Sequence, residues 1–333
     1  MGVGVSLSNL AGHVARCGGV GIISAAQIGY QEDGFDSRPI ETNQKALEKH
    51  IKKAKELARG GGIIGVNIMV ATKRYEEYVK TAVKAGVDLI ISGAGLPINL
   101  PALVEKSKTK IAPIVSSVKS ALVICKLWDR KFHRAPDLVV IEGPKAGGHL
   151  GFTYEQLKQE EDSLGFEKEI QGILVVVDGF RKKYDYKIPV VIAGGIYDKQ
   201  DMQHYLDLGA DGVQVATRFV TTYECDADER YKQAYLKAKQ ADIQIVKSPV
   251  GMPGRAIHNA FIDKTEKGLA RSVVKCHQCL ELCKQKDIPY CITDALVNAV
   301  KGNIEEGLLF CGANAYRAKS LEHVEDIMWE FAR

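Results

Sequence analysis

The sequence predicts an α/β fold, a (β/α)8 TIM barrel with a largely helical insertion or cap. Short apolar runs alternate with longer amphipathic segments along the first two thirds of the 333 residues, which is typical of βα units around a parallel sheet. A helix stop and an acidic residue precede several of these runs, as in residues 85–90, 135–140 and 209–214. Glycine-rich loops follow others, where such barrels place functional groups. A doubly wound open sheet is the alternative.

Seven apolar runs are expected to be strands, and six segments with helical spacing lie between them. The strands are residues 19–24, 63–69, 89–93, 111–116, 138–143, 190–195 and 213–217. The helices are residues 43–59, 75–85, 100–107, 120–130, 168–184 and 199–208. A closed barrel needs one more strand before residue 19, where only about a dozen residues precede the first helical pattern. The first strand is therefore expected to be truncated.

Three units are expected along the chain. Residues 1–222 would form the barrel. Strand and helix patterns no longer alternate in residues 223–307, which would form a helical insertion with a cysteine-rich segment. Residues 308–333 would return to the barrel and end in a helix over residues 321–331.

The composition excludes several classes of protein. The apolar fraction is 46% and the charged fraction 26%, and no apolar run approaches the roughly 18 residues of a membrane span. Residues 1–6 lack the features of a secretory signal, so a cytoplasmic location is expected. The net charge is only +4, with lysines dispersed among glutamates, which argues against nucleic-acid binding. In that compartment the eight cysteines are expected to be thiols or metal ligands.

A ten-residue run, EGPKAGGHLG at positions 142–151, follows the expected strand over residues 138–143. Its glycines allow the backbone to approach a flat ligand closely, and His149 stands among them. We interpret the run as a catalytic loop; an ordinary solvated turn is the alternative.

Two further strand ends predict a phosphate site. Gly194 and Gly195 precede a helix, and Ala216 and Thr217 follow the last expected strand. In many barrels the loops after strands 7 and 8 bind phosphate through backbone amides. Asn67, at another strand end, offers an amide to the edge of a heterocycle. Lys119 is a candidate positive charge near an electron-rich ring, and an exposed position in the first turn of a helix explains it equally well.

These motifs, in this order and with residues 18–23, resemble the nitronate monooxygenase family, formerly called 2-nitropropane dioxygenases. The related FMN-dependent enoyl-acyl-carrier-protein reductases share the barrel and the Gly-Gly-His loop. The resemblance implies FMN in the barrel mouth and His149 as the base beside it. The cofactor-binding residues that it implies are Asn67, Glu142, Gly147, Gly148, Gly194, Gly195, Gln214, Ala216 and Thr217.

The sequence departs from the family pattern at several positions. Glu142 stands where many members have Gln, Lys145 where Glu is usual, and Ala216 where Gly is common. The missing first strand also puts flavin contacts near residues 1–4 in doubt.

The resemblance implies oxidation of alkyl nitronates with dioxygen to carbonyl compounds and nitrite. One alternative is enoyl-thioester reduction with NAD(P)H; another is a non-catalytic barrel that binds a phosphorylated ligand. The expected partners are a small-molecule substrate, a nitronate or an enoyl thioester, and dioxygen. Neither nucleic acid nor a membrane is expected as a partner, and a homodimer is left open.

The insertion holds closely spaced candidate ligands for zinc or an iron–sulfur cluster: Cys276, His277, Cys279, Cys283 and Cys291. Free thiols in a helical cap are the alternative. Since the resemblance implies no metal, no metal ligand is assigned. Residues 248–255 are rich in Pro and Gly, so they are interpreted as a lid or a surface loop, with Arg255 as a candidate contact for an anionic substrate. Residues 309–314 are expected near the barrel mouth or in the core.

Overall fold

A curled parallel sheet forms the centre of the protein in the computed structural model, which describes residues 2–158, 165–269, 273 and 275–333. Seven strands pair in the order β1-β2-β3-β4-β5-β7-β8, each parallel to its neighbour. All seven predicted strands are confirmed. They are β1 (Val20–Ser24), β2 (Ile63–Asn67), β3 (Leu89–Ser92), β4 (Lys110–Val115), β5 (Val139–Glu142), β7 (Val190–Ala193) and β8 (Gly212–Gln214).

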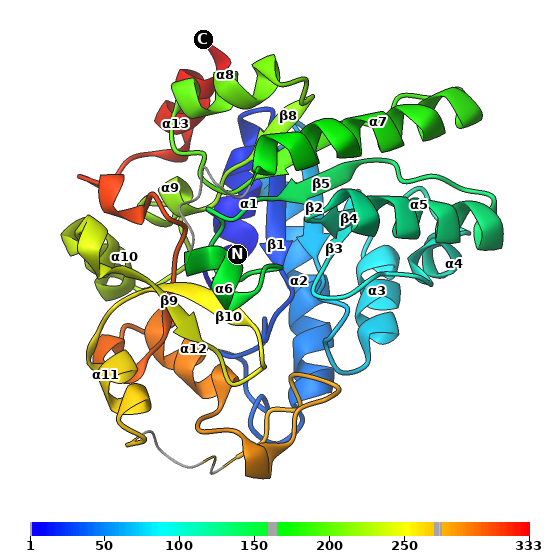
Figure 1. Cartoon of the computed structure of the whole chain (residues 1–333). Coiled ribbons are helices and arrows are strands. Elements are labelled where there is room, and N and C mark those ends of the chain that lie inside the picture. Colours follow the sequence, from blue (N-terminus) through cyan, green and yellow to red (C-terminus); the bar gives the residue numbers. More distant parts are fainter. Residues whose placement is uncertain (1, 159–164, 270–272, 274) are drawn as a thin grey trace.

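Helices connect the strands, and all six predicted helices are confirmed with shifted ends. Figure 1 shows α3, α4, α5 and α7 together on one side of the sheet. The helices of this part are α1 (Ser8–Arg16), α2 (Pro39–Ala58), α3 (Tyr75–Lys84), α4 (Leu100–Val104), α5 (Val118–Phe132), α6 (Tyr154–Lys158), α7 (Phe166–Tyr184), α8 (Lys199–Asp207) and α9 (Thr217–Val220). The start of α5 is set by a capping box between Ser117 and Ser120.

The acidic residue that recurs before the strands has a structural role. The carboxylate of Asp88 accepts a hydrogen bond from the backbone N–H of Ile64 at 3.0 Å, at the start of the neighbouring strand. Asp137 binds the N–H of Ile111 and Asp211 that of Val190 in the same way. Each carboxylate thus satisfies a backbone donor at the amino-terminal ends of the strands, opposite the predicted catalytic loop. The sequence repeat marks these strand ends.

The barrel is incomplete, as the sequence predicts. Within the described residues β1 and β8 are the two edges of the sheet and do not pair. Turns over residues 3–7 lie beside β1 instead: Ser24 N donates to Ser6 O at 3.0 Å, and Ser6 Oγ donates to Ile22 O at 2.7 Å. The fold is therefore a TIM-like, partly open barrel.

The prediction of a largely helical insertion is wrong in part. Helices α10 (Glu229–Lys237), α11 (Ala260–Glu266) and α12 (Ile292–Val300) are present, but a hairpin of β9 (Ile243–Lys247) and β10 (Pro253–Ile257) lies between them. Figure 1 shows this region grouped on the other side of the molecule from α3 to α5. The reason is local: β9 is a short run rich in β-branched residues, Ile243, Ile245 and Val246, and Pro and Gly form the turn that follows.

The insertion packs on the barrel through both a sheet and the core. Strand β10 pairs with β9, with β11 (Leu309–Phe310) and with β6 (Gly148–His149) in the predicted catalytic loop. Tyr231, Tyr235 and Ala299 belong to the same apolar core as the barrel helices. The division of the chain at residues 222 and 307 stays a prediction.

The chain returns to the barrel at its end, and the predicted final helix is confirmed as α13 (Val324–Ala332). The Arg218 guanidinium, at the start of α9, forms ion pairs with Glu322 at 2.8 Å and Glu330 at 2.7 Å, which fasten this segment. Among the described residues, no helix is both long and apolar enough to cross a bilayer.

Candidate active site

Three polar side chains lie at the carboxyl ends of barrel strands. Asn67 ends β2, Glu142 ends β5 and Gln214 ends β8. Strand alternation puts each on the same face as the interior residues two positions before it, such as Val140 before Glu142. None of the three side chains has a hydrogen-bond partner among the described residues. They are therefore available to a ligand in the barrel mouth.

The barrel interior below them is apolar. Its buried residues include Ile91, Ala112 and Val140. Burial raises the pKa of the Glu142 carboxyl to about 7. Near neutral pH this group is in part protonated, and the protonated form donates a hydrogen bond as a glutamine amide would.

The predicted catalytic loop is held by the insertion and the returning chain. The Arg255 guanidinium donates to the backbone carbonyls of Pro144 and Ala146, each at 2.6 Å. Ala313 N donates to Lys145 O at 3.1 Å. A Cβ on Gly147 would lie only 2.4 Å from the Cys311 carbonyl carbon, so glycine is required there.

These contacts correct one expectation and support another. Arg255 is only 5% exposed and lies in β10, where it positions the loop instead of meeting an anionic substrate. Residues 309–314 do reach the barrel mouth, since Gly312 N donates to Thr217 Oγ1 at 3.0 Å. The part of the predicted lid over residues 253–255 is a strand.

His149 lies in β6, paired with Gly254 of β10. Its Nε2 is 2.7 Å from Ser248 Oγ, and its ring meets Phe310 edge-on with the centroids 4.9 Å apart. Burial lowers the pKa of His149 to about 4, so the ring is neutral at physiological pH. The sequence predicts Ser248 in a lid or surface loop and Phe310 near the barrel mouth or in the core, but it pairs neither residue with His149. Nothing local could reveal these contacts, because Ser248 is 99 residues from His149 along the chain.

Two glycines after β7 and two residues after β8 form a second part of the mouth. Gly194 and Gly195 have φ of 101° and 83°, and a Cβ on Gly194 would lie 2.8 Å from Ala146 N. Among the described residues, the backbone N–H groups of Gly194, Gly195, Ala216 and Thr217 donate to no protein acceptor. Since Thr217 Oγ1 accepts from Gly312, its own proton remains available to a ligand.

These groups suit an anion, because backbone amides without a protein acceptor at adjacent strand ends favour negative charge. The predicted phosphate site therefore has the required donors on one side of the mouth. Lys119 contributes nothing to it: its side chain is exposed in the first turn of α5.

The comparisons with known proteins identify the family of this chain. The family model described as nitronate monooxygenase matches residues 1–332. The chain belongs to the nitronate monooxygenase family. This is a family of oxidoreductase enzymes whose members typically depend on a flavin.

Curated relatives share part of the chain. A protein of Staphylococcus saprophyticus named "Probable nitronate monooxygenase" is 28% identical over 199 residues, which are 59% of this chain and 51% of that protein. One of Staphylococcus haemolyticus with the same name is 36% identical over 131 residues, covering 39% and 34%. The matches thus span about half the length of these relatives or less.

Solved structures share the fold over nearly the whole chain. FabK from Thermotoga maritima has a TM-score of 0.71 at 23% identity, covering 99% of this chain and 91% of that one. A nitroalkane oxidase from Streptomyces ansochromogenes has a TM-score of 0.70 at 19% identity, covering 99% and 93%. At these identities the likeness concerns the fold alone.

The residues of the mouth fit a flavin nucleotide. A flavin needs polar groups for the edge of its ring, an apolar surface for its face and donors for its phosphate. Asn67, Glu142 and Gln214 offer the first, the barrel interior the second, and the unpaired amides after β7 and β8 the third. No described group needs to move out of a hydrogen bond to meet any of these needs.

Proposed function

We propose that this protein is an FMN-dependent nitronate monooxygenase, which oxidises alkyl nitronates with dioxygen to carbonyl compounds and nitrite. The single observation that carries the proposal is the arrangement of unpartnered polar groups at four strand ends, one of which leads into the loop that carries His149. Family membership supports the reaction class. The bound flavin would supply the electron chemistry between nitronate and dioxygen.

In this proposal the strand ends hold the cofactor. The amides of Gly194, Gly195, Ala216 and Thr217 bind the phosphate, and the Thr217 hydroxyl adds one donor. The side chains of Asn67, Glu142 and Gln214 meet the polar edge of the ring. Gly147 and Gly148 bring the loop backbone close to its face.

His149 positions the substrate and holds or accepts its proton. Because its ring is neutral, it has a lone pair that accepts the proton from the carbon beside the nitro group of a neutral nitroalkane. Toward an anionic nitronate it acts as a hydrogen-bond donor. Ser248 fixes the rotation of the ring through the 2.7 Å contact with Nε2, so it is a positioning residue.

The test begins with the absorption spectrum of the purified protein, before and after FMN is added. Dioxygen uptake with a nitronate is then compared with NAD(P)H oxidation driven by an enoyl thioester. We expect a flavin spectrum, reduction by the nitronate under anaerobic conditions, and uptake of dioxygen. Turnover with the enoyl thioester alone would assign the protein to the reductases. A protein that stays colourless with FMN would be the non-catalytic barrel.

A cytoplasmic location belongs to this proposal. The eight cysteines are all free thiols, which is the state expected in a reducing compartment. A small-molecule substrate and dioxygen are the proposed partners; no nucleic acid or membrane is proposed, and the homodimer stays open.

A further inference from the structure

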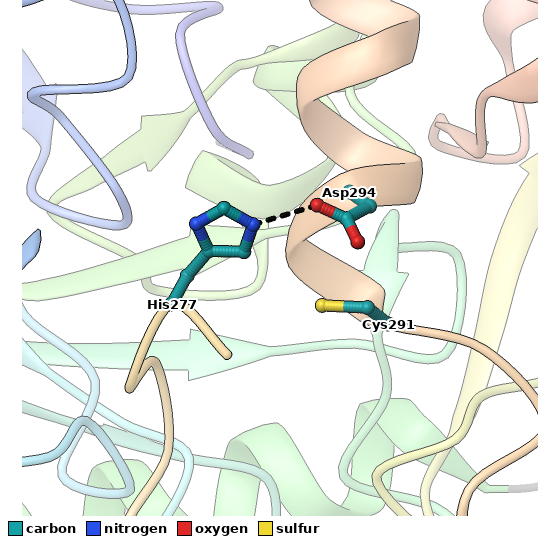
Figure 2. A group of neighbouring side chains, drawn as sticks. All are labelled: His277, Cys291 and Asp294. Carbon is teal, nitrogen blue, oxygen red and sulfur yellow. Dashed lines mark hydrogen bonds and ion pairs between the residues drawn. The ribbon is translucent and has the colours of Figure 1, made fainter. Parts of the chain in front are cut away.

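A second cluster of ligand-type side chains lies in the insertion. His277, Cys291 and Asp294 each offer one ligand atom, and these atoms all lie within 4.8 Å of one another. Figure 2 shows the three side chains converging, His277 from a loop and the other two from the start of α12. Cys291 and Asp294 are three residues apart, which puts them on the same face of the first helical turn.

His277 is the buried member of this cluster. It is only 7% exposed, and its ring stacks on Phe35 with the centroids 5.0 Å apart. Nε2 lies 2.7 Å from Asp294 Oδ1, but Nδ1 is buried with no hydrogen-bond partner among the described residues. Figure 2 shows Nδ1 on the side of the ring turned away from Asp294 and Cys291, so Nε2 is the ring nitrogen that faces the cluster.

A further thiol lies beside the cluster. Cys279 follows His277 by two residues, packs against the apolar group that includes Tyr290 and Ile292, and hydrogen-bonds with the side chain of Thr293 in α12. The backbone around it is anchored on the loop after β2: Lys73 N donates to Cys279 O at 3.2 Å. Cys279 thus lies near the start of α12, outside the three ligand atoms that share the 4.8 Å group.

The donor types identify the class of metal. A thiolate with an imidazole and a carboxylate suits Zn²⁺, whereas Mg²⁺ and Ca²⁺ select oxygen ligands only. We propose that Cys291, Asp294 and His277 Nε2 bind Zn²⁺, with the thiol of Cys279 closing in from the neighbouring loop as the fourth ligand when the ion binds. With four protein ligands the site is closed and structural. It joins the cysteine-rich loop to α12 and, through residues 71–73, to the loop after β2.

The proposal does not depend on the flavin chemistry, and its test needs no turnover. The full-length protein is loaded with Zn²⁺, dialysed, and measured by elemental mass spectrometry. We expect about one zinc per chain. Cys291→Ser and His277→Ala should each lower the affinity for Zn²⁺ at least about tenfold, in competition with a chromophoric chelator. Cys17→Ser and Cys283→Ser are the matched controls and should bind zinc as the native protein does.

Thiol protection gives a second measurement that requires no variant. In the zinc-loaded protein we expect slower alkylation of Cys279 and Cys291 than after treatment with a chelator, as read by peptide mass spectrometry. Cys17, which is exposed and distant in sequence, should react equally in both states. Equal alkylation of all three thiols in the two states would overturn the proposal.

Two other outcomes also overturn it. One is a protein that retains no zinc after loading and dialysis, or a Cys291→Ser variant that retains all of it. The other is bound iron with acid-labile sulfide that is lost in Cys276→Ser and Cys283→Ser, since that would identify a cluster held by four cysteines.

Discussion

The barrel mouth and the cysteine-rich segment, residues 276–294, both present polar atoms without protein partners, but they are held in different ways. In the mouth the groups project from strands in fixed register: Asn67 pairs with Ser24, and Ala193 pairs with both Glu142 and Gln214. The cysteine-rich segment is a loop joined to the barrel by a few backbone bonds and one stacked ring.

This difference shows which interactions fix the positions of the polar groups in each region. Backbone hydrogen bonds of a parallel sheet place the mouth before any ligand arrives, so binding there costs little reorganisation. The cysteine-rich segment has little sheet or helix to order it, and in our proposal a metal supplies that order. Four predictions sharpen or break the contrast.

The largest effect is expected at His149. The variant His149→Ala should retain FMN, because the cofactor is held by strand ends, but should lose about 100- to 10,000-fold in kcat/KM with neutral nitroalkanes, the usual contribution of a general base. Ser248→Ala should lose much less, since it removes only the group that orients the ring. Steady-state dioxygen uptake measures both. Unchanged turnover in His149→Ala would remove His149 from the mechanism.

The next effect concerns the Glu142 carboxyl, whose pKa in the folded flavin-free protein is about 7 against 4.5 unperturbed. The folded state holds its proton more tightly, so the contribution of Glu142 to stability is present at low pH and lost as the pH rises from 4.5 to 7. In Glu142→Gln this loss disappears. The free energy of unfolding of the variant, relative to native protein, should therefore rise by about 2 kcal/mol between pH 4.5 and 6.5.

His149 acts in the opposite direction. Its pKa is lowered from 6.5 to about 4, so its contribution is present above pH 6.5 and lost as the pH falls toward 4. Denaturant unfolding of the native protein and Glu142→Gln across this window separates the two groups. A constant difference between them would mean that the Glu142 carboxyl is ionised in the folded state.

A smaller effect tests how tightly the mouth is packed. Gly147→Ala should lower the free energy of unfolding by about 2 kcal/mol and weaken FMN binding, because the new methyl group meets the backbone of Cys311. Gly148→Ala is the matched control: no atom lies within 4 Å of its Cβ position, so only the positive φ of 73° costs stability, about 1 kcal/mol. Equal losses would show that Cys311 moves aside.

The smallest effect is expected at Lys119, which lies outside the proposed FMN site. Lys119 is exposed at the start of α5, so Lys119→Ala should change stability by less than about 0.5 kcal/mol and leave FMN affinity unchanged. Fluorescence titration with FMN checks this. A clear loss of affinity would extend the site beyond the strand ends and weaken the contrast with the cysteine-rich segment.

Much of the barrel could be predicted from the sequence, because its information is local. Apolar runs such as residues 63–69 and 190–195 identify buried strands. The acidic residues before other runs, such as Asp88 and Asp211, mark the strand ends where their carboxylates cap backbone donors of the neighbouring strands. The insertion was harder. Its β9 strand is short and half exposed, and its pairing with β10 and the distant β6 depends on contacts that no periodicity encodes.

The sequence by itself determined the order of the βα units and the glycine-rich strand ends, since each depends on neighbouring residues. The tertiary structure alone decided what surrounds them. It placed Arg255 under the loop carbonyls, Ser248 against His149 and Asp294 against His277. Such pairings join residues 17 to 111 positions apart, and only the packing of whole elements brings these atoms within hydrogen-bond distance.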